Sequence, residues 1–469
     1  MGFRTSKHKD SNDLSAVQSP EVDVEDGQKL EGTHDAVFGE IAKEGGPNYR
    51  NVGWIGTVVL MLKTQIGLGV LSIPSVFDTL GLVPGIICLL IIAFMTGWSA
   101  WVIGKFKLKH PEVYGIDDVG GILLGKPGRI IVGIIYCLLW VFVAGSGMLS
   151  MSIGFNALSL HGTCTAVFVA VSALLGFLVA SVRTLHKLTF VAWVGLFGIL
   201  SSILVLTVAV GVQDRPASAS REGLYVSDYH ITNQPKFAQA ISAVASLILS
   251  YAGTPAYFQI ISEMRDPRLY QRSLIVTQSI ITATYIIIGT VVYYYCGSFV
   301  ASPALGSAGP LLKRICYGLA LPGLLATTTL TVHIPAKYVF VRLLSGTKHM
   351  SSNSLTHWSV WIACTASVAI ISYIIASAIP VFGGLVALIG ALFGTLLGFQ
   401  PMGIMWLYDN WATKDRSFRW RIQACWALFV IAAGTFLMIA GTYGAVVDIL
   451  ASYTSGSTSW SCADNSNST

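Results

Sequence analysis

The chain carries, at residues 358–408, the stretch WSVWIACTASVAIISYIIASAIPVFGGLVALIGALFGTLLGFQPMGIMWLY, which contains no Asp, Glu, Lys or Arg. Folded as one α-helix, these residues would be about 76 Å long at about 1.5 Å per residue. The hydrocarbon core of a bilayer is only about 30 Å thick, so we expect two membrane-spanning helices here. Pro380 and the pair Gly383–Gly384 mark the turn between them.

The whole composition agrees with this stretch. Of 469 residues, 54% are hydrophobic and 11% are charged, and the mean hydropathy is +0.67. A soluble domain carries about a quarter charged residues, so lipid must cover much of this apolar surface. We therefore expect an all-α integral membrane protein. The charge-free runs predict eleven spans, near residues 52–77, 81–104, 130–157, 163–181, 188–212, 237–262, 273–297, 313–341, 358–379, 383–408 and 422–449.

The charges outside the spans predict the orientation. Residues 1–50 hold ten acidic and six basic residues without an apolar run, which is typical of a disordered tail. With this tail in the cytoplasm, the inner loops and flanks carry seventeen Lys and Arg and the outer ones five, as the positive-inside rule requires. Residues 51–450 then form the transmembrane domain and 451–469 an extracellular tail. The sequon at Asn467 is the candidate glycosylation site.

The eight cysteines show no metal-binding spacing. Four of them fall near the predicted outer side, where a disulfide could form: Cys164, Cys296, Cys316 and Cys462. Scattered cysteines in apolar helices are also typical small hydrophobic residues. No hydrolase elbow, zinc spacing or dinucleotide-binding context occurs in the chain. We expect no enzymatic activity, no metal or other cofactor and no nucleic-acid partner.

Two predicted spans contain residues that interrupt helices. In the first span, residues 66–70 read IGLGV and are followed by Pro74; in the sixth, residues 250–255 read SYAGTP. Either cluster alone is also typical of a kink or a packing site. Spans one and six, however, occupy corresponding positions in two five-span halves. This arrangement is expected of an inverted repeat with a substrate site between broken helices.

Broken helices expose free backbone N–H groups at one helix start and free carbonyls at the other helix end. The N–H groups attract a carboxylate and the carbonyls accept an ammonium, which suits an amino acid. The only charged residue deep in a span is Lys63, so a neutral amino acid is the simplest substrate. The candidate substrate-binding residues are Ile66, Gly67, Leu68, Gly69, Val70, Tyr251, Ala252, Gly253 and Thr254 at the breaks, with Tyr136 and Trp140 from the third span.

Lys63 and three hydroxyls of the eighth span are the candidates for ion coupling. A buried lysine can lose its proton, so Lys63 could carry the coupling proton or replace a bound cation. It could also only fix the helix break. Hydroxyls of Thr327, Thr328 and Thr331 suit a hard cation, although threonines in helices often bond to their own backbone.

Charged residues follow the sixth span directly. Glu263, Arg265 and Asp266 lie where this span meets the predicted cytoplasmic side. They could form an ion pair that acts as an inner gate. An ordinary solvated loop is the alternative.

Three segments carry a resemblance to a known family: residues 63–74 (KTQIGLGVLSIP), 114–120 (YGIDDVG) and 263–267 (EMRDP). They resemble the amino acid/auxin permease family, and within it the neutral amino acid permeases of filamentous fungi. The resemblance implies eleven spans in a five-plus-five inverted repeat of the leucine-transporter type. It also implies symport of neutral aliphatic and aromatic L-amino acids by alternating access. Protons are the expected coupling ion, and sodium is the less expected one. Leu60 stands where some proton-coupled animal relatives have histidine, so their proton route does not apply here.

These observations predict an amino acid importer of the plasma membrane. A vacuolar exporter of the same family is one alternative. The other belongs to a different class, a channel or an amino acid sensor that transports nothing. Saturable, competable flux would distinguish a carrier from both members of that class.

Overall fold

The computed structural model describes the chain in segments, which are residues 34–35, 39–40, 52–182, 185–216, 218–219, 225–344, 354–412, 416–454 and 458–466. The chain divides into two units, Met1–Asn48 and Tyr49–Thr469. In the first unit, strands β1 (His34–Asp35) and β2 (Gly39–Glu40) pair antiparallel. The described part of the second unit is helical. The expected glycosylation site Asn467 lies outside the described residues.

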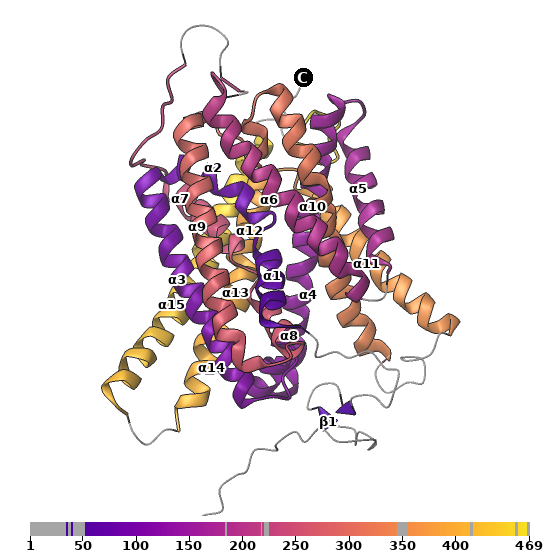
Figure 1. Ribbon diagram of the computed structural model, residues 1–469, viewed down its shortest axis with the longest axis vertical. Coiled ribbons are helices and arrows are strands. Elements are labelled where there is room, and N and C mark those ends of the chain that lie inside the picture. The colour runs from indigo at the N-terminus through magenta and orange to yellow at the C-terminus, as the bar shows by residue number, and fades with distance from the viewer. Residues whose placement is uncertain are drawn as a thin grey trace, which may run out of the picture. The chain divides into compact units, whose positions relative to one another are not determined.

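The helices of the second unit follow the order of the predicted spans (Figure 1). They are α1 (Trp54–Gln65), η1 (Gly69–Ser72), α2 (Ile73–Leu80), α3 (Leu82–Lys109), α4 (Ile116–Ser159), α5 (Thr165–Ala180), α6 (Leu185–Val212), α7 (Phe237–Ser250), η2 (Thr254–Ala256), α8 (Tyr257–Ser262), η3 (Pro267–Leu269), α9 (Tyr270–Cys296), η4 (Gly297–Phe299), η5 (Ala304–Ser307), α10 (Pro310–Leu344), α11 (Leu355–Ala378), α12 (Phe382–Ile389), η6 (Gly390–Gly394), α13 (Thr395–Gly398), α14 (Gln400–Asn410) and α15 (Phe418–Thr454).

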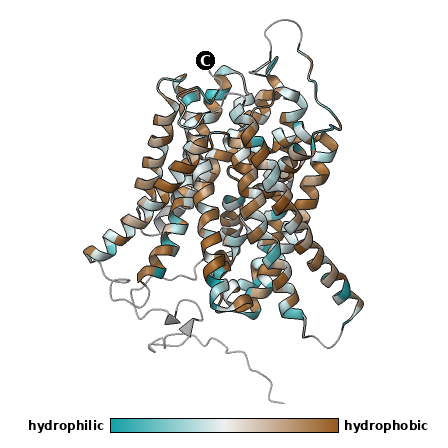
Figure 2. Cartoon of the chain, turned by 180° about the vertical axis from the view of Figure 1, so that it is seen from behind, coloured by the Kyte–Doolittle hydropathy of each residue, from teal (hydrophilic) through white to brown (hydrophobic). Residues whose placement is uncertain are grey.

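The length and apolar character of these helices make the chain a multi-pass membrane protein. Among the described residues, nine helical segments are long and apolar enough to cross a bilayer, and the bent pair α1–α2 makes a tenth. Figure 2 shows hydrophobic residues along the length of the helices. The remaining expected span corresponds to α5, whose 16 residues reach about 24 Å as a helix. The eleven-span topology stays a prediction, with α5 as its shortest member.

The helices pack in two groups that meet at the candidate site. In one group α10 packs on α4, α5, α6 and α11; in the other α9 packs on α1, α2 and α3. The second group lies largely to the left of the first in Figure 1. Helix α7 contacts α2 and is covered by α12 and α15. Gly390 in η6 lets this segment pack closely on α7, because a Cβ on Gly390 would lie only 2.0 Å from the carbonyl oxygen of Ala245.

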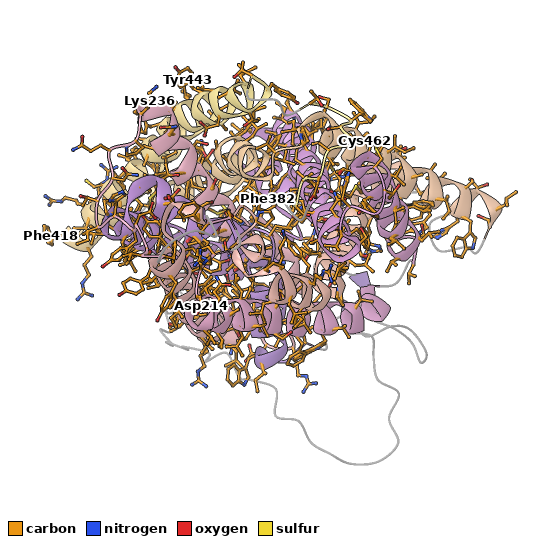
Figure 3. The ribbon with its side chains drawn as sticks, turned by 90° about the horizontal axis from the view of Figure 1, so that it is seen from above. Asp214, Lys236, Phe382, Phe418, Tyr443 and Cys462 are labelled. Atoms are coloured by element: carbon orange, nitrogen blue, oxygen red, sulfur yellow. A yellow bond between two sulfur atoms is a disulfide. The ribbon has the colours of Figure 1, made fainter. Side chains whose placement is uncertain are left out.

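The C-terminal segment 458–466 folds back over the ends of the first group. A disulfide joins Cys462 to Cys164, the residue before α5 (Cys462 is labelled in Figure 3). The side-chain amide of Asn156 on α4 donates to Asn465 at 2.7 Å, and Lys313 on α10 donates to the carbonyl of Ser466. Of the four cysteines expected near the outer side, the other two are buried free thiols, Cys296 and Cys316.

Candidate substrate site

The first span is interrupted at the residues that the sequence indicates. Helix α1 ends at Gln65, and Ile66 adopts an extended conformation with φ −78° and ψ 93°. Helical structure resumes at Gly69 in η1 and continues into α2, in which Pro74 occupies an early position where no N–H is needed. The two parts of this span differ in direction by 44°. Between them, the N–H of Ile66 still bonds to the carbonyl of Leu62 at 2.7 Å, and the carbonyl of Leu68 accepts from the N–H of Leu71 at 3.2 Å. The helical hydrogen bonding is therefore interrupted around Gly67.

The sixth span is interrupted more mildly, because Phe237–Ser262 still counts as one continuous helical segment, whereas the first span is a bent pair. Helix α7 ends at Ser250, and Tyr251 leaves the helical conformation with φ −109° and ψ 9°. The N–H of Ala252 bonds to the carbonyl of Leu249 at 3.0 Å, which closes the last turn tightly. The chain then continues through η2 into the short helix α8.

The two breaks cross each other through glycines. A Cβ on Gly69 would lie 2.4 Å from the Cα of Ser250, the last residue of α7. A Cβ on Gly253 would lie 2.7 Å from the carbonyl oxygen of Thr64, in the last turn of α1. Each glycine follows its own break and contacts the residues that precede the other break. Only glycine lets the backbones approach this closely.

A cavity of about 90 Å³ lies at this crossing. A single buried water needs only about 10–15 Å³, so the cavity has room for a small solute. Its lining comes from α1, η1, α4, α7 and α10 and the two breaks. The lining residues are Lys63, Thr64, Gln65, Gly67, Leu68, Gly69, Leu139, Trp140, Val143, Leu249, Ala252, Gly253, Thr327, Leu330, Thr331 and Ile334.

Of the fifteen predicted substrate-binding and ion-coupling residues, nine line this cavity. The six that do not line it are Ile66, Val70, Tyr251, Thr254, Tyr136 and Thr328. They are buried in the surrounding core instead. Seven lining residues were not among those predicted from the sequence, namely Thr64, Gln65, Leu139, Val143, Leu249, Leu330 and Ile334. The α4 and α10 residues of this set follow helical spacing from Trp140 and Thr327, and that spacing could have indicated them.

The cavity wall is largely apolar, with one cation, Lys63, and the uncharged polar side chains of Thr64, Gln65, Thr327 and Thr331. Leucine, valine and isoleucine side chains from α4, α7 and α10 form most of it, and none of the lining residues is Asp or Glu. The indole N–H of Trp140 is buried and makes no hydrogen bond among the described residues. The Trp140 ring packs edge-on against Tyr136, with 6.0 Å between the ring centroids. The wall thus presents the unpaired indole N–H of Trp140 within a largely apolar surface.

Lys63 connects the two helix groups at the cavity. Its ammonium donates to the hydroxyl of Thr327 on α10 at 2.9 Å, and the side chain is 6% exposed. Thr327 in turn donates to the carbonyl of Gly323 at 2.9 Å. The other two threonines make different contacts, because Thr331 bonds back to its own helix and Thr328 donates to the sulfur of Met151. Among these three hydroxyls, only that of Thr327 holds the Lys63 ammonium.

The candidate gate residues lie beside a backbone bridge. The N–H of Val52, just before α1, donates to the carbonyl of Glu263 at 3.1 Å, and the N–H of Arg265 donates to the carbonyl of Val52 at 3.0 Å. Asp266 caps η3 by accepting from the N–H of Arg268 at 3.0 Å. Burial raises the pKa of Glu263, and the charge of Lys337 on α10 opposes this shift. The bridge ties the start of α1 to the end of α8.

The comparisons with known proteins agree with this geometry. A family profile described as "Transmembrane amino acid transporter protein" matches residues 50–447. The chain belongs to this family. As its sequence resemblance implies, it is an amino acid/auxin permease. It is 32% identical to a "Transmembrane transporter" of Gibberella moniliformis, over 90% of this chain and 89% of the relative.

Two further relatives have more specific names. The permease is 31% identical to the "N amino acid transport system protein" of Neurospora crassa, over 90% of each chain. It is also 26% identical to "Vacuolar amino acid transporter 3" of Schizosaccharomyces pombe, over 56% of this chain and 40% of the relative. The family is one of amino acid transporters and not of enzymes.

Proposed function

We propose that this permease imports neutral aliphatic and aromatic L-amino acids across the plasma membrane by proton symport. The observation that carries this proposal is the cavity at the crossing of the two broken helices. Backbone N–H groups of Gly67 and Leu68, just before η1, and of Gly69, its first residue, bind the carboxylate. Carbonyls of Ala252 and Gly253 accept the ammonium.

The side chain of the substrate packs against the apolar part of the cavity wall. This wall contains Leu139, Val143, Leu330 and Ile334 and carries no carboxylate. A cationic side chain would have no counter-ion there, and an anionic one would find only Lys63, which already bonds to Thr327. Neutral amino acids therefore fit best.

Lys63 is the proton carrier of this mechanism. Its charged amine holds Thr327 across the interface between α1 and α10, and charge-assisted hydrogen bonds are about twice as strong as neutral ones. Loss of the proton weakens this bond and releases α1 from α10. A sodium ion would need the same hydroxyl oxygen, which supports the proton over sodium.

Alternating access takes place in a frame of eleven spans, with the N-terminus cytoplasmic and the C-terminus extracellular. The reciprocal glycine contacts at the two breaks support a five-plus-five inverted repeat. The cytoplasmic gate is the bridge between Val52 and Met264 with its neighbours Glu263, Arg265 and Asp266. Opening it separates the start of α1 from the end of α8.

Proteoliposomes containing the purified permease test the function. Labelled neutral amino acids should accumulate under an inward proton gradient, saturate with concentration and exchange with unlabelled substrate from inside. Accumulation driven by sodium alone would reject proton symport. Linear flux that unlabelled substrate does not reduce would identify a channel. Binding without flux would identify a sensor.

A vacuolar exporter is the second candidate, favoured by the similarity to the vacuolar transporter of Schizosaccharomyces pombe. Imaging a fluorescently labelled permease in fungal cells distinguishes the two. Signal at the cell boundary, with uptake into intact cells, supports the importer. Signal at the vacuole supports the exporter.

A further inference from the structure

Tyr285 on α9 contacts the freed backbone of both breaks. Its hydroxyl lies 2.8 Å from the carbonyl oxygen of Gln65, the last residue of α1. It also lies 2.8 Å from the carbonyl oxygen of Ser250, the last residue of α7. The side chain has no exposed surface. One phenol group thus reaches the final carbonyl of each interrupted helix.

A tyrosine hydroxyl has a single proton, whereas these two neighbours are both acceptors. The proton must be shared between the carbonyls or pass from one to the other. Final carbonyls of a helix have no partner within their own helix, and a buried carbonyl without a donor is costly. In this buried region the Tyr285 hydroxyl therefore stabilises the open ends of both helices together.

Other side chains of α9 strengthen the contact with the broken spans. The Tyr285 ring packs edge-on against Tyr251, with 5.2 Å between centroids. The hydroxyls of Tyr251 and Thr282 lie 3.3 Å apart. At the far end of α1, the hydroxyl of Ser273 donates to the carbonyl of Trp54 at 2.9 Å. Helix α9 thus supports α1 at both ends and reaches the second break as well.

We propose that Tyr285 is a positioning residue for transport: by sharing one proton between the carbonyls of Gln65 and Ser250, it holds the two breaks in the geometry that binds substrate. This inference rests on the proposed function, because it assumes that the breaks form the substrate site. Tyr285 does not line the cavity, so it acts on the substrate only through the backbone that it holds.

Tyr285→Phe removes the hydroxyl and keeps the ring. Tyr270→Phe is the matched control, because Tyr270 is also a buried tyrosine of α9 whose hydroxyl donates to one backbone carbonyl, that of Ala100 at 3.1 Å. Uptake should be measured in proteoliposomes over a range of leucine and phenylalanine concentrations. We expect Tyr285→Phe to raise KM about tenfold at normal reconstitution yield, and Tyr270→Phe to leave KM within twofold. A merely structural role would lower the yield of folded permease and leave KM unchanged.

Hydrogen–deuterium exchange of the purified permease provides a readout that does not need transport. Peptides covering residues 64–72 and 250–256 should both exchange at least fivefold faster in Tyr285→Phe, and neither should in Tyr270→Phe. Unchanged exchange in both segments, or an equal KM increase in both variants, would overturn the proposal. If the wild-type permease moves no amino acid, the proposed function fails, and the exchange data still decide whether Tyr285 holds the breaks.

Discussion

Gly69 and Ser250 lie in van der Waals contact, although 181 positions separate them in the sequence. A methyl group on Gly69 would lie 2.4 Å from the Cα and 2.8 Å from the Oγ of Ser250. The second pair, Gly253 and Thr64, has a similar contact, since a methyl group on Gly253 would lie 2.7 Å from the Thr64 carbonyl oxygen. The spacing of the two breaks therefore depends on two missing side chains.

Gly69→Ala should reduce amino acid uptake at least about tenfold. The added methyl group must push the two breaks apart, and overpacking of this kind costs about 1–3 kcal/mol. Gly253→Ala should have a similar effect, because its methyl group would push the same two backbones apart at their second contact, with Thr64. Uptake per folded molecule, normalised by fluorescence size-exclusion chromatography, measures the loss.

Gly318→Ala is the control for both glycines, since Gly318 lies in α10 and a methyl group on it would lie 3.9 Å from the side chain of Leu158, an ordinary van der Waals distance. It should transport like the wild type. Normal uptake in Gly69→Ala would mean that the crossing is not the transport site.

Lys63→Met should remove the response of uptake to an imposed proton gradient. Methionine keeps an unbranched side chain of similar length but cannot hold the Thr327 hydroxyl. Thr327→Val should weaken the coupling as well, whereas Thr327→Ser keeps the hydroxyl and should preserve it. Counterflow at equal pH on both sides separates coupling from binding. Gradient-driven accumulation that persists in Lys63→Met would exclude this lysine as the proton carrier.

Replacing both Cys164 and Cys462 by serine should lower the melting temperature by about 2–4 °C. A native disulfide contributes about 2–4 kcal/mol, and the entropy of unfolding of about 2.1 cal/mol/K per residue makes each kcal/mol worth about 1 °C in a chain of 469 residues. A reductant should lower the melting temperature of the wild type and leave the double variant unchanged. Cys425→Ser, at an exposed free thiol, is the control. Insensitivity of the wild type to reductant would argue against a bonded pair in the mature protein.

Asp117→Asn should destabilise the packing of α4 on α10. The Asp117 carboxylate is mostly buried and accepts from Arg342 of α10, with Arg129 at 3.6 Å. Both arginines are about half exposed, which limits the expected loss to about 0.5–1 kcal/mol. Thermal unfolding measures this loss of stability. The control is Glu112→Gln, which changes an exposed carboxylate. Equal melting temperatures for the two variants would contradict the prediction.

The sequence predicted the fold where membrane physics leaves few alternatives. Most charge-free runs correspond to helices long and apolar enough to cross a bilayer, and the glycines near Ile66 and Tyr251 coincide with the two interruptions. It could not predict which side chains next to the breaks face the cavity, because the helical phase is lost at each break. Ile66 and Tyr251 therefore point into the core, whereas Gln65 lines the cavity. The sequence also could not predict that Cys164 pairs with Cys462, since four cysteines were expected near the outer side and any two of them could have formed a bond.

The bond between Cys164 and Cys462 also constrains how the protein is made. The two cysteines are 298 positions apart, so the first is synthesised long before the second. The bond cannot form until α15 has entered the bilayer and the last residues have reached the same side as the start of α5. A translation product that stops after Thr454 would keep Cys164 as a free thiol. The disulfide thus reports that synthesis has passed Cys462 and that α15 has been inserted.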